Sequence, residues 1–327
     1  MKTYDLGWGE SVAVRQAFLK VSNANVNFDF NALSNLGYPK HEGEPELIEL
    51  TRQIIKRQTG NHYNHILITN GATGGVTIAL RSFCQSRGIK ECVTRKPPYF
   101  RLYPHMIRSA GMYQTYEEAY GIDRVFLVDS LSNPLGTFSE MKKDSVKSPI
   151  IWDSVYYGNV YAPGNHPQPD HDVLVGSYSK LTGLNGLRIG WIACNDPSGY
   201  EKMKNLVTAE YCGISATSTK IVMETVGKLS SKQWEEFEYK AQLNLDYNRE
   251  EFSKLEKFFG DTPVGKYGMF YYAPIDGACL KLLIDSGIVW SPGSHLGDTN
   301  DFARFNIGQD VKLIKEAVAT ILKNDRR

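Results

Sequence analysis

The sequence has few of the features that mark secreted, membrane-bound or nucleic-acid-binding proteins. It contains five cysteines in 327 residues, and none of them forms a CxxC pair, so we expect neither a disulfide framework nor a zinc site. Its formal net charge of +1 gives no electrostatic reason to expect nucleic acid or an anionic membrane as a partner. No apolar run approaches membrane-spanning length, and the first residues lack the apolar core of a signal peptide. We therefore expect a cytoplasmic protein.

Three common cofactor and metal motifs are also absent. Gly71, Gly74 and Gly75 lack the GxGxxG spacing of a dinucleotide-binding loop. No GxxxxGK[ST] run occurs, so nucleotide hydrolysis is not expected. The seven histidines form no HExxH or similar pattern, so we expect no catalytic metal.

The pattern of apolar residues predicts an α/β fold. Residues 44–58 have an apolar stripe at helical spacing. Short apolar runs then alternate with helical or loop segments. These runs cover residues 65–69, 125–128, 149–152, 172–175 and 189–193. Such an alternation is typical of a mainly parallel sheet covered by helices.

The C-terminal third has a different pattern. From about residue 197 the sequence becomes helical, and residues 236–259 predict a long helix that Gly260 ends. From residue 269 onward, short strands and helices mix. We expect this last part to form a smaller α+β domain, with a boundary near 225–235 that no Pro/Gly linker marks.

The most informative stretch is residues 177–191, SYSKLTGLNGLRIGW. It places Lys180 in a glycine-rich loop with Ser177, Ser179 and Arg188. Hydroxyls, an arginine and loop amides together make a cradle for phosphate. A lysine in such a cradle either neutralises the phosphate or forms a Schiff base with a phosphorylated aldehyde cofactor. Pyridoxal 5′-phosphate (PLP) is the obvious candidate for that cofactor.

Polar residues follow the ends of the expected strands. A glycine-rich loop at 70–75 follows the first run, Asn133 follows the second, Asp153 the third and Lys180 the fourth. In an open α/β sheet, ligands bind outside the carboxyl ends of the strands, so these groups would meet at one rim. Arg188 precedes its strand and would reach the same rim if that strand runs antiparallel.

Taken in order, these motifs resemble those of the fold-type I PLP enzymes. The closest likeness is to class I/II aminotransferases, including the histidinol-phosphate aminotransferase-like branch, and it runs from residues 5–10 (DLGWGE) to 304–308 (RFNIG). The resemblance implies an aspartate aminotransferase-like fold, in which a large domain has a mainly parallel seven-stranded sheet. It implies a large PLP-binding domain over 38–230 and a small domain over 231–327, which the segment 1–37 joins.

The resemblance also implies roles around the cofactor ring. Lys180 would form the Schiff base, and Asp153 would pair with the protonated pyridine nitrogen. Tyr156 and Asn133 would hydrogen-bond to the phenolic oxygen of the ring. Phe100, in the run PYFRLYP at 98–104, would stack on the ring. Lys180, Asp153 and Tyr156 would be the catalytic residues.

The phosphate and the substrate would be bound by further residues. The resemblance implies a phosphate site made by Gly71, Ala72, Thr73, Ser177, Ser179 and Arg188, and by Tyr38 reaching across from another subunit. Arg304 would hold the α-carboxylate of the substrate through a bidentate contact. Gly7, Trp8 and Asn133 would also contact the substrate. Because the family builds its site at a subunit interface, the resemblance implies a homodimer.

Several of these residues have a simpler structural explanation. Asp153 could cap a helix, Asn133 could belong to a turn before a proline, and Arg188 could form a structural ion pair. Ser179 could be a loop hydroxyl without a ligand, and Phe100 could be a core residue.

The resulting interpretation is a PLP-dependent aminotransferase that moves an amino group from an amino acid to a 2-oxo acid by a ping-pong mechanism. In that mechanism, the amine of Lys180 transfers the α-proton. The motifs leave open a PLP-dependent decarboxylase or C–S lyase of the same fold. A non-catalytic PLP-fold module is disfavoured because Lys180, Asp153 and Arg188 are all present.

Overall fold

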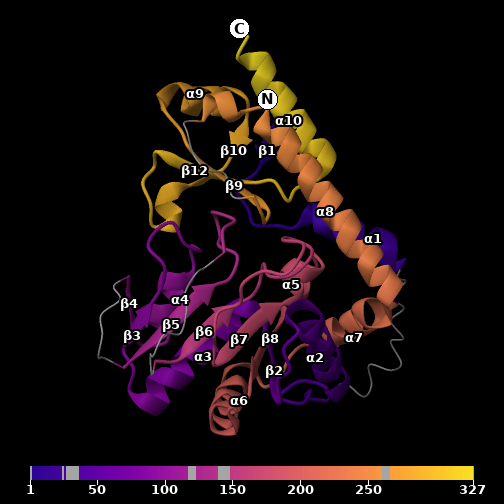
Figure 1. Cartoon of the computed structure of the whole chain (residues 1–327), viewed down its shortest axis with the longest axis vertical. Coiled ribbons are helices and arrows are strands. Elements are labelled where there is room, and N and C mark those ends of the chain that lie inside the picture. The colour runs from indigo at the N-terminus through magenta and orange to yellow at the C-terminus, as the bar shows by residue number, and fades with distance from the viewer. Residues whose placement is uncertain are drawn as a thin grey trace.

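A computed structural model of the chain describes residues 2–23, 26, 37–116, 123–138, 148–259 and 266–326. It has two parts, one built around a seven-stranded sheet and one around a three-stranded sheet (Figure 1). The two chain termini lie together at the end that carries the smaller sheet. Within the described ranges, no helix is long and apolar enough to cross a membrane.

The large sheet has the strand order β2-β8-β7-β6-β5-β3-β4. Its strands are β2 (His65–Asn70), β3 (Glu91–Val93), β4 (Tyr113–Thr115), β5 (Arg124–Asp129), β6 (Ile150–Asp153), β7 (Val173–Ser177) and β8 (Ile189–Cys194). Strand β8 is antiparallel to both of its neighbours, whereas the pairs among β4, β3, β5, β6 and β7 are parallel. The five predicted runs are therefore strands, and the mainly parallel seven-stranded sheet is confirmed. The sequence reasoning missed β3 and β4 as individual strands because each has only three residues.

Helices flank this sheet because their apolar faces pack against it. They are α2 (Pro45–Thr59), α3 (Gly71–Arg87), α4 (Tyr103–Ser109) and α6 (Pro197–Tyr211). The single-turn helix α5 (Tyr178–Leu181) follows β7, and α7 (Ala216–Thr225) packs on α2. Helix α2 confirms the helix predicted over 44–58. It begins with a proline in its first turn and ends at Gly60 in the left-handed conformation, which is the usual asymmetry of helix ends. Trp152 and Trp191 are among the largest fully buried side chains of the sheet.

The long helix α8 (Ser231–Ser253) differs from its prediction at both ends. It begins earlier because Ser230 and Gln233 form a capping box, which supplies acceptors for the first free amides. It ends earlier because the chain turns after Ser253, and Leu255 and Phe259 then fold into the core of the smaller part. The predicted stop, Gly260, lies outside the described residues.

The smaller part combines both ends of the chain. Its elements are β1 (Tyr4–Asp5), β9 (Phe270–Pro274), α9 (Gly277–Asp285), β10 (Ile288–Val289), β11 (Ser291–Pro292), β12 (Phe302–Asn306) and α10 (Val311–Asn324). Strands β11, β12 and β9 form the antiparallel three-stranded sheet, and β1 pairs in parallel with β10. Helix α1 (Val12–Ser22) packs on α8, where the Phe18 and Phe237 ring centroids are 5.5 Å apart. The domain limits at residues 37 and 230 stay a prediction.

Four short 3-10 turns complete the described elements. They are η2 (Asn185–Leu187), η3 (Val226–Lys228), η4 (Glu256–Phe258) and η5 (Gly293–Leu296). The first of these lies between Lys180 and Arg188 in the loop that the sequence analysis singled out.

Candidate active site

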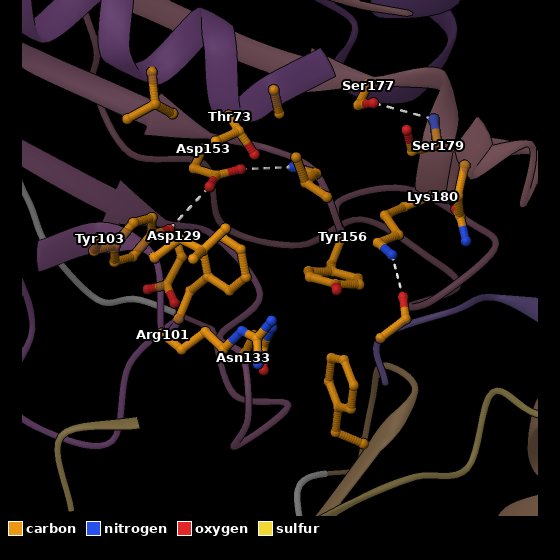
Figure 2. A pocket seen from close by; sticks show the side chains of 18 of the residues that line it. Thr73, Arg101, Tyr103, Asp129, Asn133, Asp153, Tyr156, Ser177, Ser179 and Lys180 are labelled. Carbon is orange, nitrogen blue, oxygen red and sulfur yellow. Dashed lines mark hydrogen bonds between the residues drawn. The ribbon is translucent and has the colours of Figure 1, made fainter. Parts of the chain in front are cut away.

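A cavity of about 370 Å³ lies at the carboxyl ends of the parallel strands (Figure 2). Strand β5 ends at Asp129, β6 at Asp153 and β7 at Ser177, and all three residues line the cavity. Arg188 lies just before the antiparallel strand β8 and lines the same cavity. The expected convergence of strand ends on one rim, including the condition set for Arg188, is therefore confirmed.

Most of the residues with predicted roles lie in this cavity. Those that line it are Gly7, Trp8, Ala72, Thr73, Phe100, Asn133, Asp153, Tyr156, Ser177, Ser179, Lys180, Arg188 and Arg304. Gly71 lies directly behind the Arg188 guanidinium, since a Cβ at Gly71 would be 2.4 Å from Nη2. Tyr38 does not line the cavity and is 90% exposed. The individual roles given to these residues stay predictions.

Lys180 projects into the cavity from the single-turn helix α5. The hydroxyl of Ser177 caps this helix by accepting a hydrogen bond of 3.1 Å from the Ser179 amide. The Lys180 Nζ donates to the carbonyl of Gly9. Burial lowers the pKa of Lys180 to about 8, and the nearby positive charges of Arg304 and Arg188 act in the same direction. A neutral amine, which is the nucleophilic form, is therefore accessible near physiological pH.

Asp153 lies on the opposite side of the cavity from Lys180, with Tyr156 between them in Figure 2. Its carboxylate accepts hydrogen bonds of 2.9 Å from the Tyr103 hydroxyl and 3.1 Å from the Val155 amide. Burial raises the pKa of Asp153 to about 6, against the opposing effect of these two donors. The two donors fix the orientation of the carboxylate.

Arg304 reaches the cavity from β12 in the smaller part. Its guanidinium donates 3.1 Å to Asn133 Oδ1 and 2.9 Å to the Gly7 carbonyl, and it lies 4.3 Å from the Phe270 ring centroid. Burial lowers the pKa of Arg304 to about 10. Its Nε is buried and has no hydrogen-bond partner among the described residues. A buried, unpaired donor of this kind is suited to an anionic ligand.

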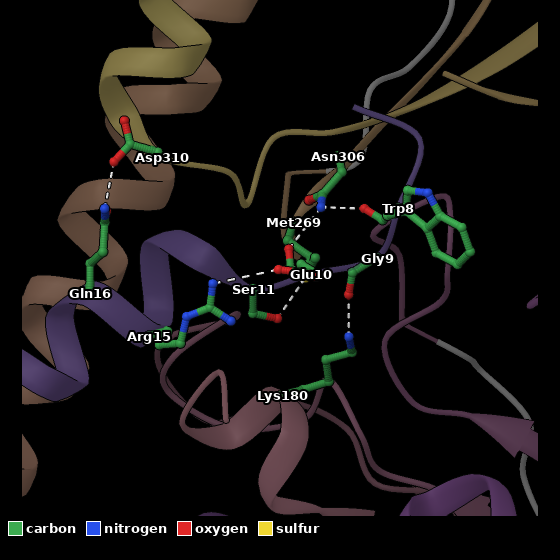
Figure 3. A network of polar contacts seen from close by, with 10 residues as sticks. All are labelled: Trp8, Gly9, Glu10, Ser11, Arg15, Gln16, Lys180, Met269, Asn306 and Asp310. Carbon is green, nitrogen blue, oxygen red and sulfur yellow. Dashed lines mark hydrogen bonds and ion pairs between the residues drawn. The ribbon is translucent and has the colours of Figure 1, made fainter. Parts of the chain in front are cut away.

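Residues 7–10, which we call the N-terminal wall, line the cavity. Figure 3 shows Trp8, Gly9 and Glu10 of this wall with the side chains that bind them. The Asn306 amide donates 2.5 Å to the Trp8 carbonyl and 2.7 Å to the Glu10 carbonyl. Because Lys180 donates to Gly9 between them, three successive carbonyls are held by side chains from distant parts of the chain. Asn306 belongs to the motif at 304–308, but no sequence pattern distinguished it from its neighbours.

The opposite end of the cavity has the donors that a phosphate requires. Ala72 and Thr73 lie in the first turn of the 17-residue helix α3, where free amides and the helix dipole favour an anion. Arg188 donates 3.2 Å to the Ser179 hydroxyl. The Ser177 hydroxyl caps α5 and also donates a hydrogen bond of 3.0 Å to the Ile189 carbonyl. In this structure its hydrogen is therefore bonded to the backbone at the start of β8.

The donor set therefore fits PLP. An amine of lowered pKa and a buried carboxylate face one cavity, and a helix N-terminus with an arginine and a serine lies at its end. The volume is within the range of small-molecule sites. No single one of these groups would identify the cofactor, because each also occurs in structural roles in other proteins.

Further residues line the cavity without having been assigned a role from sequence. They include Gly9, Glu10, Arg101, Tyr103, Asp129, Asn185 and Phe270. Arg101 and Tyr103 occur in the run at 98–104 that suggested Phe100. The sequence feature that could have indicated Arg101 and Tyr103 is their position close to Phe100.

Comparisons with known proteins find relatives named as aminotransferases and as alliin lyases. Residues 11–260 match a family model described as allinase. Tryptophan aminotransferase-related protein 2 of Arabidopsis thaliana is 30% identical over 164 residues, which are 46% of this chain and 37% of that protein. The (5-formylfuran-3-yl)methyl phosphate transaminase of Methanocaldococcus jannaschii is 25% identical over 288 residues, 79% of this chain and 74% of that protein. Alliin lyase 1 of Allium sativum is 32% identical over 111 residues, 33% of this chain and 22% of that protein.

The fold is shared with solved aminotransferase structures. The aspartate aminotransferase of Thermotoga maritima has a TM-score of 0.80 at 16% identity, covering 100% of this chain and 92% of that one. The aromatic aminotransferase of Pyrococcus horikoshii has a TM-score of 0.77 at 18% identity, covering 99% and 96%. The predicted aspartate aminotransferase-like fold is confirmed, and the narrower histidinol-phosphate branch stays a prediction. Because the match to the family model covers most of the sequence, the chain belongs to the allinase family, whose members are PLP-dependent enzymes.

Proposed function

We propose that this protein is a PLP-dependent aminotransferase that moves an amino group from an amino acid to a 2-oxo acid in two half-reactions. The observation that carries the proposal is the partly buried Lys180 amine, with its lowered pKa, in one cavity with Asp153 and Arg304. Two of the relatives described above are named as aminotransferases or transaminases, and they support the same reaction. Their alignments cover 46% and 79% of this chain.

Bound PLP would supply an electron sink that stabilises negative charge at the substrate Cα. Lys180 is the residue that would hold the cofactor covalently and then move the proton at Cα. Asp153 would keep the pyridine nitrogen protonated, and Tyr156 and Asn133 would hold the phenolic oxygen. Burial raises the pKa of Tyr156, so its hydroxyl stays a donor throughout the working pH range. Phe100 would cover one face of the ring.

The phosphate would be held by the α3 N-terminus at Ala72 and Thr73 together with Ser179 and Arg188. Gly71 allows this contact because any side chain there would collide with the Arg188 guanidinium. Ser177 would position Lys180 by capping α5.

Arg304 would bind the α-carboxylate of the substrate. Its unpaired Nε and its contact with Asn133 both lie at the cavity. Gly7 and Trp8, which belong to the N-terminal wall, would contact the substrate on the same side of the cavity. By holding the carboxylate, Arg304 would orient the substrate against the cofactor and would thereby select which bond to Cα is broken.

A C–S lyase is the second candidate, because the family model is described as allinase and alliin lyase 1 is among the relatives. A lyase would break the C–S bond, release the sulfur-containing leaving group together with ammonia and a 2-oxo acid, and leave the cofactor as the aldehyde. An amino-acid decarboxylase would instead release carbon dioxide.

The decisive experiment mixes the purified holoenzyme with single amino acids and records the cofactor spectrum. An aminotransferase gives one equivalent of 2-oxo acid and converts the cofactor to its amine form. Borohydride reduction should label Lys180, while Lys180→Ala should remove the label and Lys202→Ala, an exposed lysine on α6, should not. Release of ammonia or carbon dioxide without the amine form would replace the transaminase with a lyase or a decarboxylase.

A homodimer and a cytoplasmic location also stay proposals. Tyr38 is 90% exposed and lies outside the cavity, which suits a residue that contacts the phosphate site of another copy. Sedimentation of the holoenzyme tests this: a fully active monomer would remove the role proposed for Tyr38.

A further inference from the structure

Arg101 lines the cavity but has no part in the proposed chemistry. It lies in the loop just before α4, one residue after Phe100, and its side chain extends into the cavity in the direction of Asn133 (Figure 2). Its guanidinium carbon is 5.4 Å from the centroid of the Trp8 ring. Trp8 is 63% exposed, so this pair stands at the open side of the cavity, where a substrate side chain would project.

No carboxylate neutralises Arg101. Among the described residues it forms no ion pair, although Glu10, Asp129 and Asp153 line the same cavity. Glu10 pairs instead with Arg15 at 3.5 Å, and Asp129 faces Arg95 at 3.8 Å. The guanidinium of Arg101 is thus free to bind an incoming anion.

The other cations of the cavity each have a proposed partner. Arg188 faces the phosphate end, Arg304 the α-carboxylate, and Lys180 the cofactor aldehyde. Arg101 is close enough to Arg304 for its charge to lower the pKa of that group. Two neighbouring guanidinium groups of this kind suit a ligand with two anionic groups, because each anion offsets one positive charge.

We propose that Arg101 determines specificity by binding a second anionic group, a carboxylate or a phosphate, on the side chain of the substrate. The substrates would then be acidic or phosphorylated amino acids and the corresponding 2-oxo acids. The Trp8 ring would hold the guanidinium in place through a cation–π contact. This inference rests on the proposed function and names its substrate class.

Binding of unreactive acids tests the proposal without relying on turnover. Succinate and glutarate probe two carboxylates, 3-phosphonopropionate probes a phosphate-like group, and butyrate and valerate supply one carboxylate only. Affinities for the holoenzyme are measured by calorimetry at constant ionic strength. A charge-assisted hydrogen bond at a partly buried site corresponds to a preference of about tenfold or more for the dianions.

Arg101→Gln should remove that preference and leave the affinity for butyrate within about twofold. Arg101→Lys keeps the cation and should keep part of the preference, which excludes misfolding as the cause of a loss. Arg108→Gln removes the same charge from an exposed position on α4 and should behave as the wild type. A stronger preference for glutarate than for 3-phosphonopropionate assigns the carboxylate, and the reverse assigns the phosphate.

Equal affinities for glutarate and valerate, or an unchanged preference in Arg101→Gln, would overturn the proposal. The half-reaction separates this failure from failure of the proposed function. Conversion of the cofactor by glutamine as readily as by glutamate, and by serine as readily as by phosphoserine, would refute the role of Arg101 while retaining the aminotransferase. An Arg101-dependent dianion preference without cofactor conversion by any amino acid would refute the aminotransferase while retaining the anion site.

Discussion

Burial moves the pKa values of Asp153 and Lys180 toward each other, to about 6 and about 8. The sign of the effect on stability differs between them. The folded state binds the proton of Asp153 more tightly than the unfolded state, so stability falls as the pH rises from about 4 to about 6. The unfolded state binds the proton of Lys180 more tightly, so stability rises between about pH 8 and about 10.5. Near pH 7 both side chains are charged in the folded apo protein, and burial of each charge lowers its stability. Such a loss of stability is expected of groups whose role is to bind a ligand.

The substitution Asp153→Asn should stabilise the apo protein at neutral pH while removing activity. At pH 7 the wild-type carboxylate is charged and largely removed from water, and raising its pKa from about 4 to about 6 corresponds to about 3 kcal/mol. The gain should shrink as the pH falls from about 6 to about 4 and vanish below about pH 3, where Asp153 is protonated in both states. Urea unfolding at both pH values measures this, with the exposed Asp170→Asn as control. An equal effect of Asp153→Asn at the two pH values would contradict the burial argument.

Tyr103→Phe tests the donor that holds Asp153. The Tyr103 hydrogen bond lowers the pKa of Asp153, so its loss should raise that pKa and shift the acid limb of the kcat/KM profile to higher pH. A hydrogen bond to a charged group corresponds to about 1.5–3 kcal/mol, or about ten- to a hundredfold in kcat/KM. The control is Tyr116→Phe, which removes a hydroxyl bonded to Tyr99 outside the cavity. An acid limb that does not move would show that Tyr103 only fills space.

At the scale of elements, the apolar runs predicted the strands that are long and buried, because such runs have few alternatives. The three-residue strands β3 and β4 and both ends of α8 could not be predicted in the same way. Neither could the direction of β8, which follows from its pairing with β2 and β7. That direction matters for the site because it brings Arg188 to the same rim as Lys180.

Gly190→Ala tests how closely β8 must approach the start of α3. A Cβ at Gly190 would lie 2.4 Å from the Gly71 carbonyl carbon, 2.7 Å from the Ala72 nitrogen and 2.8 Å from the Gly176 oxygen. All three are backbone atoms and cannot turn aside, so the cost should be about 2–3 kcal/mol or more. The amides proposed for the phosphate would also move, so PLP affinity should fall.

Gly186→Ala is the matched control, because no atom lies within 4 Å of a Cβ there and no positive φ is required. Chemical denaturation and PLP titration of both variants make the comparison. Similar stability and PLP affinity of the two variants would show that β8 and α3 can separate without harm.

At the scale of the whole molecule, the cavity forms only when segments far apart in sequence meet. The order of motifs predicted which strand ends converge, because that geometry belongs to every open α/β sheet. The supporting residues were not predicted, since their roles arise from contacts over long separations. Tyr103 and Asp153 are 50 residues apart, and Asn306 and Trp8 are 298 apart. No local pattern distinguishes such an asparagine or tyrosine from an ordinary core residue.

Asn306→Ala should release the N-terminal wall from the smaller part of the protein. The wild-type side chain is fully buried, donates to the Trp8 and Glu10 carbonyls, and accepts 2.9 Å from the Gly308 amide. Its removal should cost about 2–4 kcal/mol of stability, because the buried Gly308 amide and two partly buried carbonyls lose their partner. The amides of residues 7–11 should exchange hydrogen faster than in the wild type, beyond the general loss of protection.

Asn324→Ala provides the comparison, since that side chain donates to Asp285 and Ser286 far along α10 and contacts no part of the cavity. It should leave exchange at residues 7–11 and the KM for the amino donor unchanged. In Asn306→Ala the KM should rise, because Gly7 and Trp8 no longer stand where Arg304 holds the carboxylate. If exchange at residues 7–11 in Asn306→Ala matches that in Asn324→Ala, the other contacts of residues 7–10 are enough to hold the wall, and the clamp assigned to Asn306 is wrong.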